Sequence, residues 1–161
     1  MHFHDLVRPE LPRLHGLALR LSRDPEGAED LLQSALEQGL RRFGQLRDPG
    51  AFRVWMSRIV VRTWQNGRAR KRPDQVALHE VPVHDDTVAR REAGGRIHQA
   101  LAELPEAQRI AVWMIDGLGY RFGEAAEILA ISPGTVASRV ARGRSALRVT
   151  LGDLATSGGL R

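Results

Sequence analysis

The stretch FGEAAEILAISPGTVASRVARGRSAL, residues 122–147, constrains the fold more than any other part of the chain. Its pattern predicts a short helix over 122–129, a turn over 130–132 and a longer helix that begins at Pro133. Ser132 is a favourable N-cap, and proline suits the first helical position because an N–H there would have no helical partner. Two helices joined by such a short turn are typical of a helix-turn-helix motif.

The second helix of this stretch carries two different faces when about 100° separates successive residues. One face is small and apolar, so it can pack on the first helix, where Ala125 and Ala126 allow a close approach. Arg144 lies off both faces, and we expect it to contact a phosphate or a partner protein. An ordinary amphipathic helix pair with solvated arginines is the alternative interpretation. The apolar face consists of Val136, Val140, Gly143 and Leu147, and the polar face that suits a DNA groove consists of Thr135, Ser138, Arg139 and Arg142.

The cations of this chain are almost all arginine, since Lys71 is the one lysine among 24 basic residues and the formal net charge is +5. Guanidinium groups form planar, bidentate hydrogen bonds with phosphate and guanine, which suits a nucleic-acid partner. A GC-rich genome also favours arginine, so the argument must rest on where the arginines cluster. Cysteine is absent, which excludes disulfides and thiolate metal sites. Because apolar runs are too short for a membrane span and the N-terminus does not resemble a signal peptide, we expect a soluble cytoplasmic protein without membrane insertion.

Three helices are predicted before residue 73. The first covers residues 6–22, and its firm part follows Pro12. The dipeptides Asp24-Pro25 and Asp48-Pro49 each start another helix, with aspartate as the cap and proline at the first helical position. The second of these helices has the apolar stripe Ala28, Leu31, Leu32, Ala35, Leu36, Leu40 and Phe43.

The third of these helices is strongly basic, because no acidic residue occurs from Arg53 to Arg72. A basic helix that also contains tryptophans suits a surface that binds phosphates and stacks bases. Trp55 falls in the apolar stripe and is expected in the core, whereas Trp64 lies off the centre of the stripe and is the candidate for base stacking. Solvated arginines around two core tryptophans are the alternative.

The second half begins after residues 73–87, which show no helical period, contain two prolines and are predicted to be a linker. A helix over 88–104 has Ile97, Leu101 and Leu104 on one face. A largely apolar helix follows over 105–117 and is expected to be central in its domain.

The chain is therefore predicted to be all-α, with two small helical domains. We place the domains at 1–72 and 88–152, joined by the linker and followed by a flexible tail over 153–161. No stretch alternates with period two, so no sheet is predicted. Limited proteolysis should cut first in the linker. The alternative is that the halves pack together, with the basic helix against acidic residues of the second half.

No sequence motif of this chain indicates an enzymatic activity. The chain lacks phosphate-binding, nucleophile-elbow and zinc-protease motifs. His2 and His4 form only a weak metal-binding pattern, and the acidic pair Glu29-Asp30 lies on a leucine-rich helix. We therefore predict no catalytic residue, no metal and no cofactor.

Two segments together identify a family resemblance. EGAEDLLQSALEQGLRRF followed by GAFRVWMSRIV resembles region 2 of extracytoplasmic-function (ECF) sigma factors of bacterial RNA polymerase. ALAELPEAQRIAVWMIDGLGYRFGEAAEILAISPGTVASRVARGRSALR resembles region 4 of the same family. The order and spacing of the two segments also match, as does the short linker in place of a middle domain. The resemblance implies a non-enzymatic subunit that gives the polymerase its promoter specificity.

The resemblance also implies partners and residue roles. The partners are core RNA polymerase, through its clamp and flap elements, promoter DNA and an anti-sigma factor. Asp30, Leu31 and Gln33 are expected to dock on the polymerase clamp. The candidates for contact with the single-stranded −10 element are Arg58, Arg62, Trp64 and Arg68. The candidates for the −35 duplex are Thr135, Ser138, Arg139, Arg142 and Arg144.

Some residues depart from the family pattern, and two other functions stay open. Ser34 stands where glutamate is common, and Arg62 where many members have asparagine. Ala130 replaces the usual turn glycine, which costs of order 1 kcal/mol if the position needs a positive φ. One alternative is a free-standing helix-turn-helix regulator, although no dimerisation helix is evident. The other is a sigma-like decoy that binds polymerase or an anti-sigma factor without initiating transcription.

Overall fold

The computed structural model describes residues 2–70 and 88–157, and within these ranges the secondary structure is helical, with no strand. The all-α prediction is therefore confirmed for the described part of the chain. None of these helices combines the length and the hydropathy that crossing a bilayer requires. The predicted linker at 73–87 lies outside the described residues.

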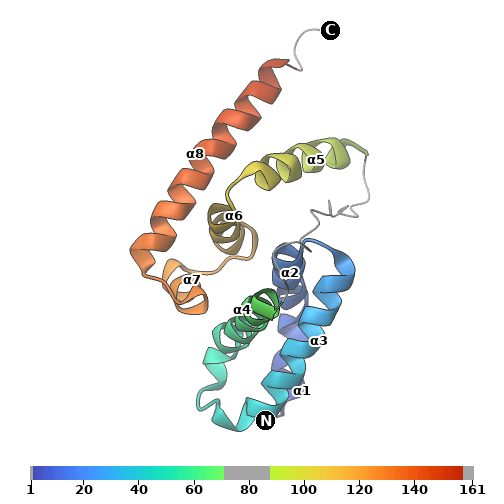
Figure 1. Cartoon of the computed structure of the whole chain (residues 1–161), viewed down its shortest axis with the longest axis vertical. Coiled ribbons are helices and arrows are strands. Elements are labelled where there is room, and N and C mark those ends of the chain that lie inside the picture. Colours follow the sequence, from blue (N-terminus) through green and yellow to red (C-terminus); the bar gives the residue numbers. More distant parts are fainter. Residues whose placement is uncertain (1, 71–87, 158–161) are drawn as a thin grey trace.

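The first half consists of α1 (Phe3–Val7), α2 (Leu11–Ser22), α3 (Pro25–Arg42) and α4 (Phe52–Arg70). α2, α3 and α4 pack side by side in the lower part of Figure 1. The predicted helix starts are close to the observed ones. The chain is already helical from Phe3, earlier than predicted. The prediction took the prolines near residue 10 as a barrier to a helix, but one of them fits a short 3-10 turn between α1 and α2.

Aspartate caps start two of these segments, as predicted. The Asp24 carboxylate accepts a hydrogen bond from the Gly27 amide at 2.5 Å, at the beginning of α3. The Asp48 carboxylate accepts one from the Gly50 amide at 2.9 Å. The second cap opens a 3-10 turn over Pro49–Ala51, so α4 itself begins three residues after the predicted proline.

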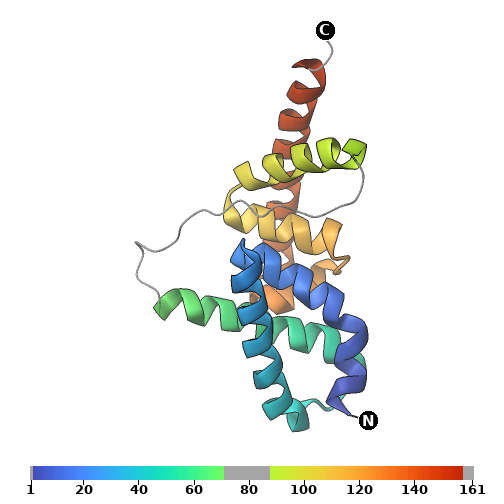
Figure 2. The same cartoon turned by 90° about the vertical axis from the view of Figure 1, so that its right-hand side faces the viewer.

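The second half consists of α5 (Val88–Glu103), α6 (Glu106–Val112), α7 (Phe122–Leu129) and α8 (Pro133–Ser157). α6 continues into a π-helical turn over Trp113–Gly117. α7 and the start of α8 have the predicted bounds. α8 continues to Ser157 and projects beyond the rest of the molecule (Figures 1 and 2), and the flexibility of the tail over 153–161 stays a prediction.

One hydrophobic core runs through both halves. Its buried members come from α2, α3 and α4 and also from the segment that leads into the helix-turn-helix motif. α7 packs on α4, which places the first helix of that motif against the basic helix. The alternative that the halves pack together therefore describes the structure. Core residues that are almost fully buried include Leu14, Leu17, Met56, Val60, Met114, Ile128, Val136 and Val140.

The predicted apolar stripe of α3 needs one correction. Leu40 is 61% exposed, whereas Gly39 beside it is buried. A Cβ added at Gly39 would lie 2.7 Å from Met56 Sδ, so the absence of a side chain lets α4 come close at this position. The close approach turns Ala35 and Gly39 toward α4 and leaves Leu40 at the surface. In α5, similarly, Ile97 is 45% exposed, whereas Ala100 and Leu101 in the last turn of the helix are buried.

Gly143 fixes the packing of α8 on α6. A Cβ added there would lie 2.6 Å from Val112 Cγ2. We expect Gly143→Ala to lower the free energy of unfolding by about 1–3 kcal/mol, although alanine favours a helix, because overpacking outweighs propensity. The matched control is Gly134→Ala in the first turn of the same helix, where the nearest atom would be Ser132 Oγ at 3.9 Å. Urea unfolding followed by circular dichroism checks both variants, and a stabilised Gly143→Ala protein would contradict the close approach.

Candidate nucleic-acid interface

The turn of the helix-turn-helix motif is built as the sequence predicts. Ser132 caps α8, since its Oγ accepts a hydrogen bond from the Thr135 amide at 3.1 Å. Ala130 ends α7 in the left-handed conformation, with φ 55° and ψ 45°. A non-glycine residue in this conformation carries a cost of about 1 kcal/mol, so the predicted strain is present.

The two predicted faces of α8 are confirmed by burial. Val136 and Val140 are buried against the domain. Arg142 is exposed and Arg139 is half-buried. The hydroxyl-bearing residues of the polar face have local partners: Ser138 Oγ donates to the Thr135 carbonyl at 3.0 Å, and the Thr135 hydroxyl lies 2.8 Å from that of Ser132. The long cationic side chains are therefore the groups best placed to reach a DNA groove.

Arg144 differs from its neighbours because it has an acidic partner. Its Nε and Nη2 donate to the two carboxylate oxygens of Asp116 at 2.9 and 2.5 Å. The hydrogen bond and the negative charge of Asp116 raise the pKa of Arg144 above its ordinary value. This pair joins α8 to the π-helical turn that follows α6, and contact of Arg144 with a phosphate or a partner protein stays a prediction.

The predicted −10 residues lie together on α4, but two of the three arginines are occupied. Arg62 is exposed. Arg58 forms an ion pair with Glu127 of α7. Arg68 forms one with Glu106 of α6 at 2.6 Å and lies 4.8 Å from the centre of the Trp64 ring.

The two tryptophans of α4 both touch the core. Trp55 is partly buried against it and lies 5.9 Å from the Phe52 ring, so its predicted core position is confirmed. Trp64 is also partly buried against the core, and the Arg68 guanidinium lies over its ring. Base stacking by Trp64 stays a prediction and requires that this cover move away.

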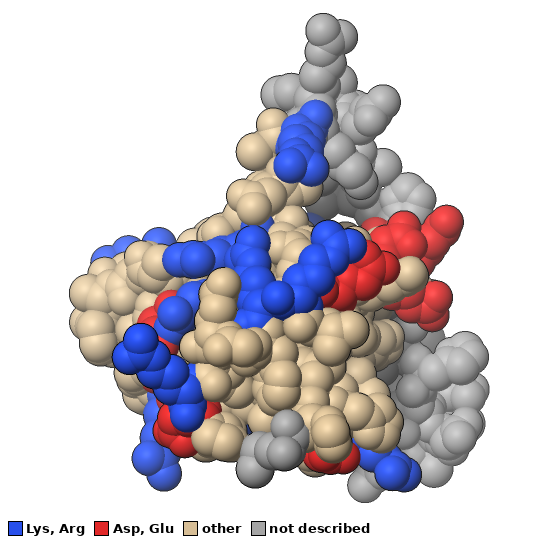
Figure 3. Space-filling view, turned by 90° about the horizontal axis from the view of Figure 1, so that it is seen from below, with Lys and Arg blue, Asp and Glu red and all other residues tan. Residues whose placement is uncertain are grey.

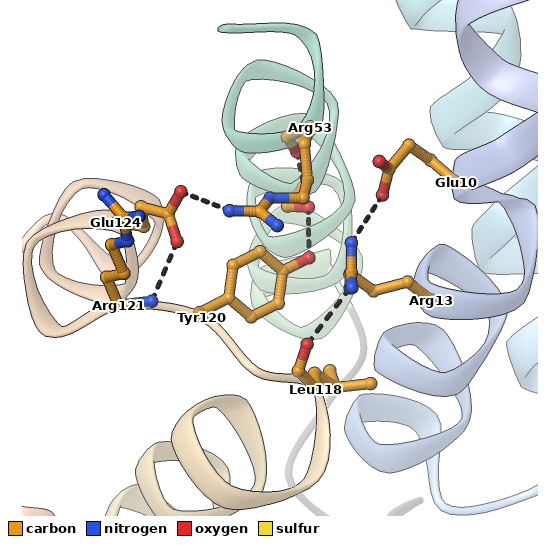
Figure 4. A network of polar contacts seen from close by, with 8 residues as sticks. Glu10, Arg13, Arg53, Leu118, Tyr120, Arg121 and Glu124 are labelled. Carbon is orange, nitrogen blue, oxygen red and sulfur yellow. Dashed lines mark hydrogen bonds and ion pairs between the residues drawn. The ribbon is translucent and has the colours of Figure 1, made fainter. Parts of the chain in front are cut away.

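A polar contact between the halves was not predicted from the sequence (Figure 4). The Ser57 and Tyr120 hydroxyls lie 2.6 Å apart, and both residues are buried. Arg53 of α4 pairs with Glu124 of α7 beside them. Arg13 reaches across from α2 and donates to the Leu118 carbonyl at 3.0 Å. No local pattern signals these contacts, because the partners lie far apart in the sequence.

Desolvation and hydrogen bonding act in opposite directions on two groups of this contact. Burial raises the pKa of Tyr120, although the hydrogen bond with Ser57 works against the rise. Burial by itself would raise the pKa of Glu124 too. Hydrogen bonds from the Arg121 amide and from Arg53 outweigh it, so the pKa of Glu124 lies below its ordinary value. Both groups therefore keep their expected charge states at neutral pH.

A second contact between the halves lies at α2. The Arg20 guanidinium lies 3.6 Å from the centre of the Trp113 ring, and its Nη2 is 2.9 Å from His98 Nε2. Burial lowers the pKa of Arg20. Guanidinium groups stack well on indole rings, so this contact helps to attach the π-helical turn after α6 to the first half.

The predicted polymerase-docking residues fall into two groups. Asp30 and Gln33 are exposed on α3. Leu31 is only 8% exposed and belongs to the core, and its contact with the polymerase stays a prediction. The helix period explains this burial, because Leu31 shares the buried face with Ala28 and Ala35. Beside Gln33 lies an open apolar groove of about 490 Å³, lined by Phe3, Glu29, Leu32, Leu36, Glu37 and Leu40.

In Figure 3, basic side chains form a band across the middle of a largely uncharged face, with acidic side chains next to them. Among the described residues, no cluster of three or more histidine or acidic side chains could hold a metal ion. The structure therefore contains two basic helices, α4 and α8. It also has an exposed surface on α3 that combines acidic side chains with an apolar groove.

Comparisons with known proteins agree with this arrangement. Residues 6–73 match the family model for Sigma-70 region 2, and residues 94–147 match the one for Sigma-70 region 4. The ECF RNA polymerase sigma factor SigM of Mycobacterium tuberculosis is 37% identical over 161 residues, which cover 99% of this chain and 82% of SigM. The RNA polymerase sigma-H factor of Pseudomonas aeruginosa is 29% identical, with 94% of this chain and 87% of that protein covered.

A solved structure has the same architecture over nearly the whole chain. The sigma factor RpoE of Bartonella quintana, determined in complex with the anti-sigma factor NepR, superposes with a TM-score of 0.74. It is 26% identical, and the match covers 92% of this chain and 98% of RpoE. The chain therefore belongs to the extracytoplasmic-function group of the sigma-70 family of RNA polymerase sigma factors.

Proposed function

We propose that this sigma factor binds core polymerase through α3, captures the −10 element on α4 and reads the −35 element with α8. The observation that carries the proposal is the pairing of two basic helices in one chain. One belongs to a helix-turn-helix motif with a capped recognition helix, and the other, α4, contains no acidic residue. The protein has no catalytic role in this scheme, since it supplies specificity to the polymerase.

The −35 contact is assigned to the exposed arginines of α8. Arg142 and Arg139 lie beside the buried face that holds the helix in place. A guanidinium can form two parallel hydrogen bonds with O6 and N7 of guanine, which is a frequent specific contact in the major groove. Thr135 and Ser138 are assigned to shorter-range contacts at the N-terminal end of the same helix.

The −10 contact is assigned to Arg58, Arg62 and Arg68, which offer phosphate contacts, and to Trp64, which offers a stacking surface. Stacking on an aromatic side chain contributes about 1–3 kcal/mol per base in single-stranded complexes. We assign the chain a cytoplasmic location, where polymerase and promoter DNA meet, and the division 1–72, 73–87 and 88–152 to its domains. Because RpoE was solved with an anti-sigma factor, we also propose such a regulator for this chain.

Transcription in vitro with core polymerase tests the proposal. We expect the chain to start transcripts at defined sites on a library of bacterial promoter fragments, and permanganate footprinting to detect melted DNA there. Core polymerase without the chain is the control. Inhibition without initiation would instead identify a decoy, and specific duplex binding without polymerase would identify a free-standing regulator.

A further inference from the structure

Three arginines gather where the end of α2 faces α6 and the turn that follows it (Figures 1 and 2). Arg20 lies in the last turn of α2, Arg23 is the residue at which this helix ends, and Arg109 lies on α6. All three are half-buried. Among the described residues, none of them forms an ion pair with a carboxylate. We name these three residues the arginine triad.

The arginine triad is short of negative charge. Burial lowers the pKa of Arg109, and the positive charge of Arg23 lowers it further. Glu106 acts in the opposite direction, but its carboxylate already accepts a hydrogen bond from Arg68 at 2.6 Å. Burial also lowers the pKa of Arg20. The cations of the triad are therefore kept close together without a carboxylate of their own.

The same place contains hydrogen-bond donors that lack acceptors. In the described part of the chain, Arg109 Nε and Trp113 Nε1 are buried donors without a partner. Arg109 Nη1 donates to the Leu104 carbonyl at 3.2 Å, and this acceptor carries no net charge. A buried donor without an acceptor destabilises a protein. An anion with several oxygens would supply both the missing acceptors and the missing charge.

Arg23 has a backbone conformation that favours glycine. It ends α2 with φ 64° and ψ 17°, in the left-handed region. A residue with a Cβ adopts this conformation at a cost that glycine avoids. Glycine at this position would also remove the repulsion between Arg23 and Arg109. Arginine is therefore unfavourable here in the isolated chain for two separate reasons, and a bound anion would turn its charge into a favourable one.

The chemistry of the arginine triad indicates the class of ligand. Several cations attract an anion with more than one negative charge, and a guanidinium matches a phosphate group with two parallel N–H donors. Arg20 already covers one face of the Trp113 ring at 3.6 Å, so a nucleobase could not stack on that face. The backbone of a nucleic acid contacts exposed cations, whereas these arginines are half-buried between helices, which suits a small anion better.

We propose that the arginine triad binds a small phosphorylated anion between the end of α2 and α6. The inference goes beyond the proposed function, because the site is separate from the surfaces of α3, α4 and α8 that we assign to polymerase and DNA. The groups that hold the anion come together only in the folded chain. Binding therefore stabilises the fold, and the stabilisation increases with the concentration of the anion.

The test is thermal unfolding of the full chain at neutral pH, in sodium pyrophosphate and in sodium chloride of equal ionic strength. We expect pyrophosphate to raise the unfolding temperature of the unmodified chain. The Arg23→Gly protein should unfold at a higher temperature than the unmodified chain in chloride, because strain and repulsion are removed. It should nevertheless lose most of its response to pyrophosphate. A purely structural role of Arg23 would not produce these two effects of opposite sign.

Ala130→Gly is the matched control. Within the described residues, Ala130 is the other non-glycine residue with a positive φ, and it ends α7, outside the arginine triad. This variant should also gain stability in chloride, because the same kind of backbone strain is removed. It should keep the full response to pyrophosphate. The control also accounts for the general stabilisation that phosphate salts give to folded proteins.

Calorimetric titration with pyrophosphate measures the affinity directly. We expect Kd to be at least about tenfold weaker for Arg23→Gly than for Ala130→Gly, because the substitution removes one charged donor. Arg109→Gln should weaken binding by a similar factor. Nuclear magnetic resonance of the ¹⁵N-labelled chain places the ligand, since the Nε–H signal of Arg109 and the indole N–H signal of Trp113 should shift during the titration.

The proposal is overturned if Arg23→Gly and Ala130→Gly respond equally to pyrophosphate, or if the unmodified chain does not respond. A random-sequence DNA duplex serves as a further ligand. If the duplex stabilises the chain through Arg23 and pyrophosphate does not, the arginine triad binds nucleic-acid phosphates and the assignment to a small anion is wrong. Transcription by the unmodified chain with core polymerase reports on the proposed function independently of these results.

Discussion

Replacing Asp30 with arginine is expected to abolish binding to core polymerase while leaving the fold intact. Asp30 is exposed on α3, the helix that also contributes Leu36 and Leu40 to the apolar groove, so the substitution alters the surface and not the core. Truncation of one partner in a buried interfacial charge pair costs about 2–5 kcal/mol, and reversal adds repulsion, so the affinity should fall at least about 100-fold. Titration of labelled chain with core polymerase measures the loss.

Two further variants make this result specific. Glu103→Arg reverses another exposed charge, on α5, and should leave polymerase binding unchanged. Leu31→Ala should lower the free energy of unfolding by about 2–5 kcal/mol, because Leu31 is a core residue. Unchanged affinity of the Asp30→Arg protein for core enzyme would remove α3 from the docking surface.

Replacing Arg142 with alanine is expected to relax the preference at one or two positions of the −35 element. Arg142 is exposed, and no acidic residue stands at three or four positions from it along α8 to neutralise its charge. A bidentate contact to guanine is worth roughly 1–3 kcal/mol of discrimination against the wrong base. Selection of −35 variants with the altered protein measures this preference. A uniform loss over all sequences would make Arg142 a backbone contact.

Arg144→Ala is the informative comparison. From the sequence we expect this change to weaken binding to all sequences alike and to flatten the salt dependence. The structure adds a second effect, since the substitution leaves the Asp116 carboxylate without its two hydrogen bonds from Arg144. A loss of binding should therefore be accompanied by a small loss of stability. Double substitution with Asp116→Asn would separate the two effects.

Local signals in the sequence were enough to predict most helix boundaries. Asp24, Asp48 and Ser132 are short polar caps followed by proline, and each accepts a backbone hydrogen bond where expected. The start of α4 was placed too early because the Asp48 cap opens a 3-10 turn first. A cap signal indicates that a helical segment starts but does not distinguish the first turn's type.

Residues that depend on packing between elements were harder to predict. Leu31 and Leu40 share an apolar stripe in the sequence, yet one is buried and the other exposed, since Gly39 sets how α4 lies on α3. Arg58 was correctly placed on a basic helix, but its partner Glu127 lies 69 positions away in the sequence. The periodicity of one helix carries no information about which distant helix will cover it.

The buried contact between Ser57 and Tyr120 affects how halves could be exchanged between sigma factors. A hybrid that took its second half from a relative would keep a recognition helix, but it would retain this contact only if the donor had a tyrosine at the matching position. It would also need an indole opposite Arg20, which Trp113 provides here. Without these groups the two halves of the hybrid would pack against each other less firmly, although the apolar core that joins them would remain. Residues far from the recognition helix would then decide how well a transplanted half packs.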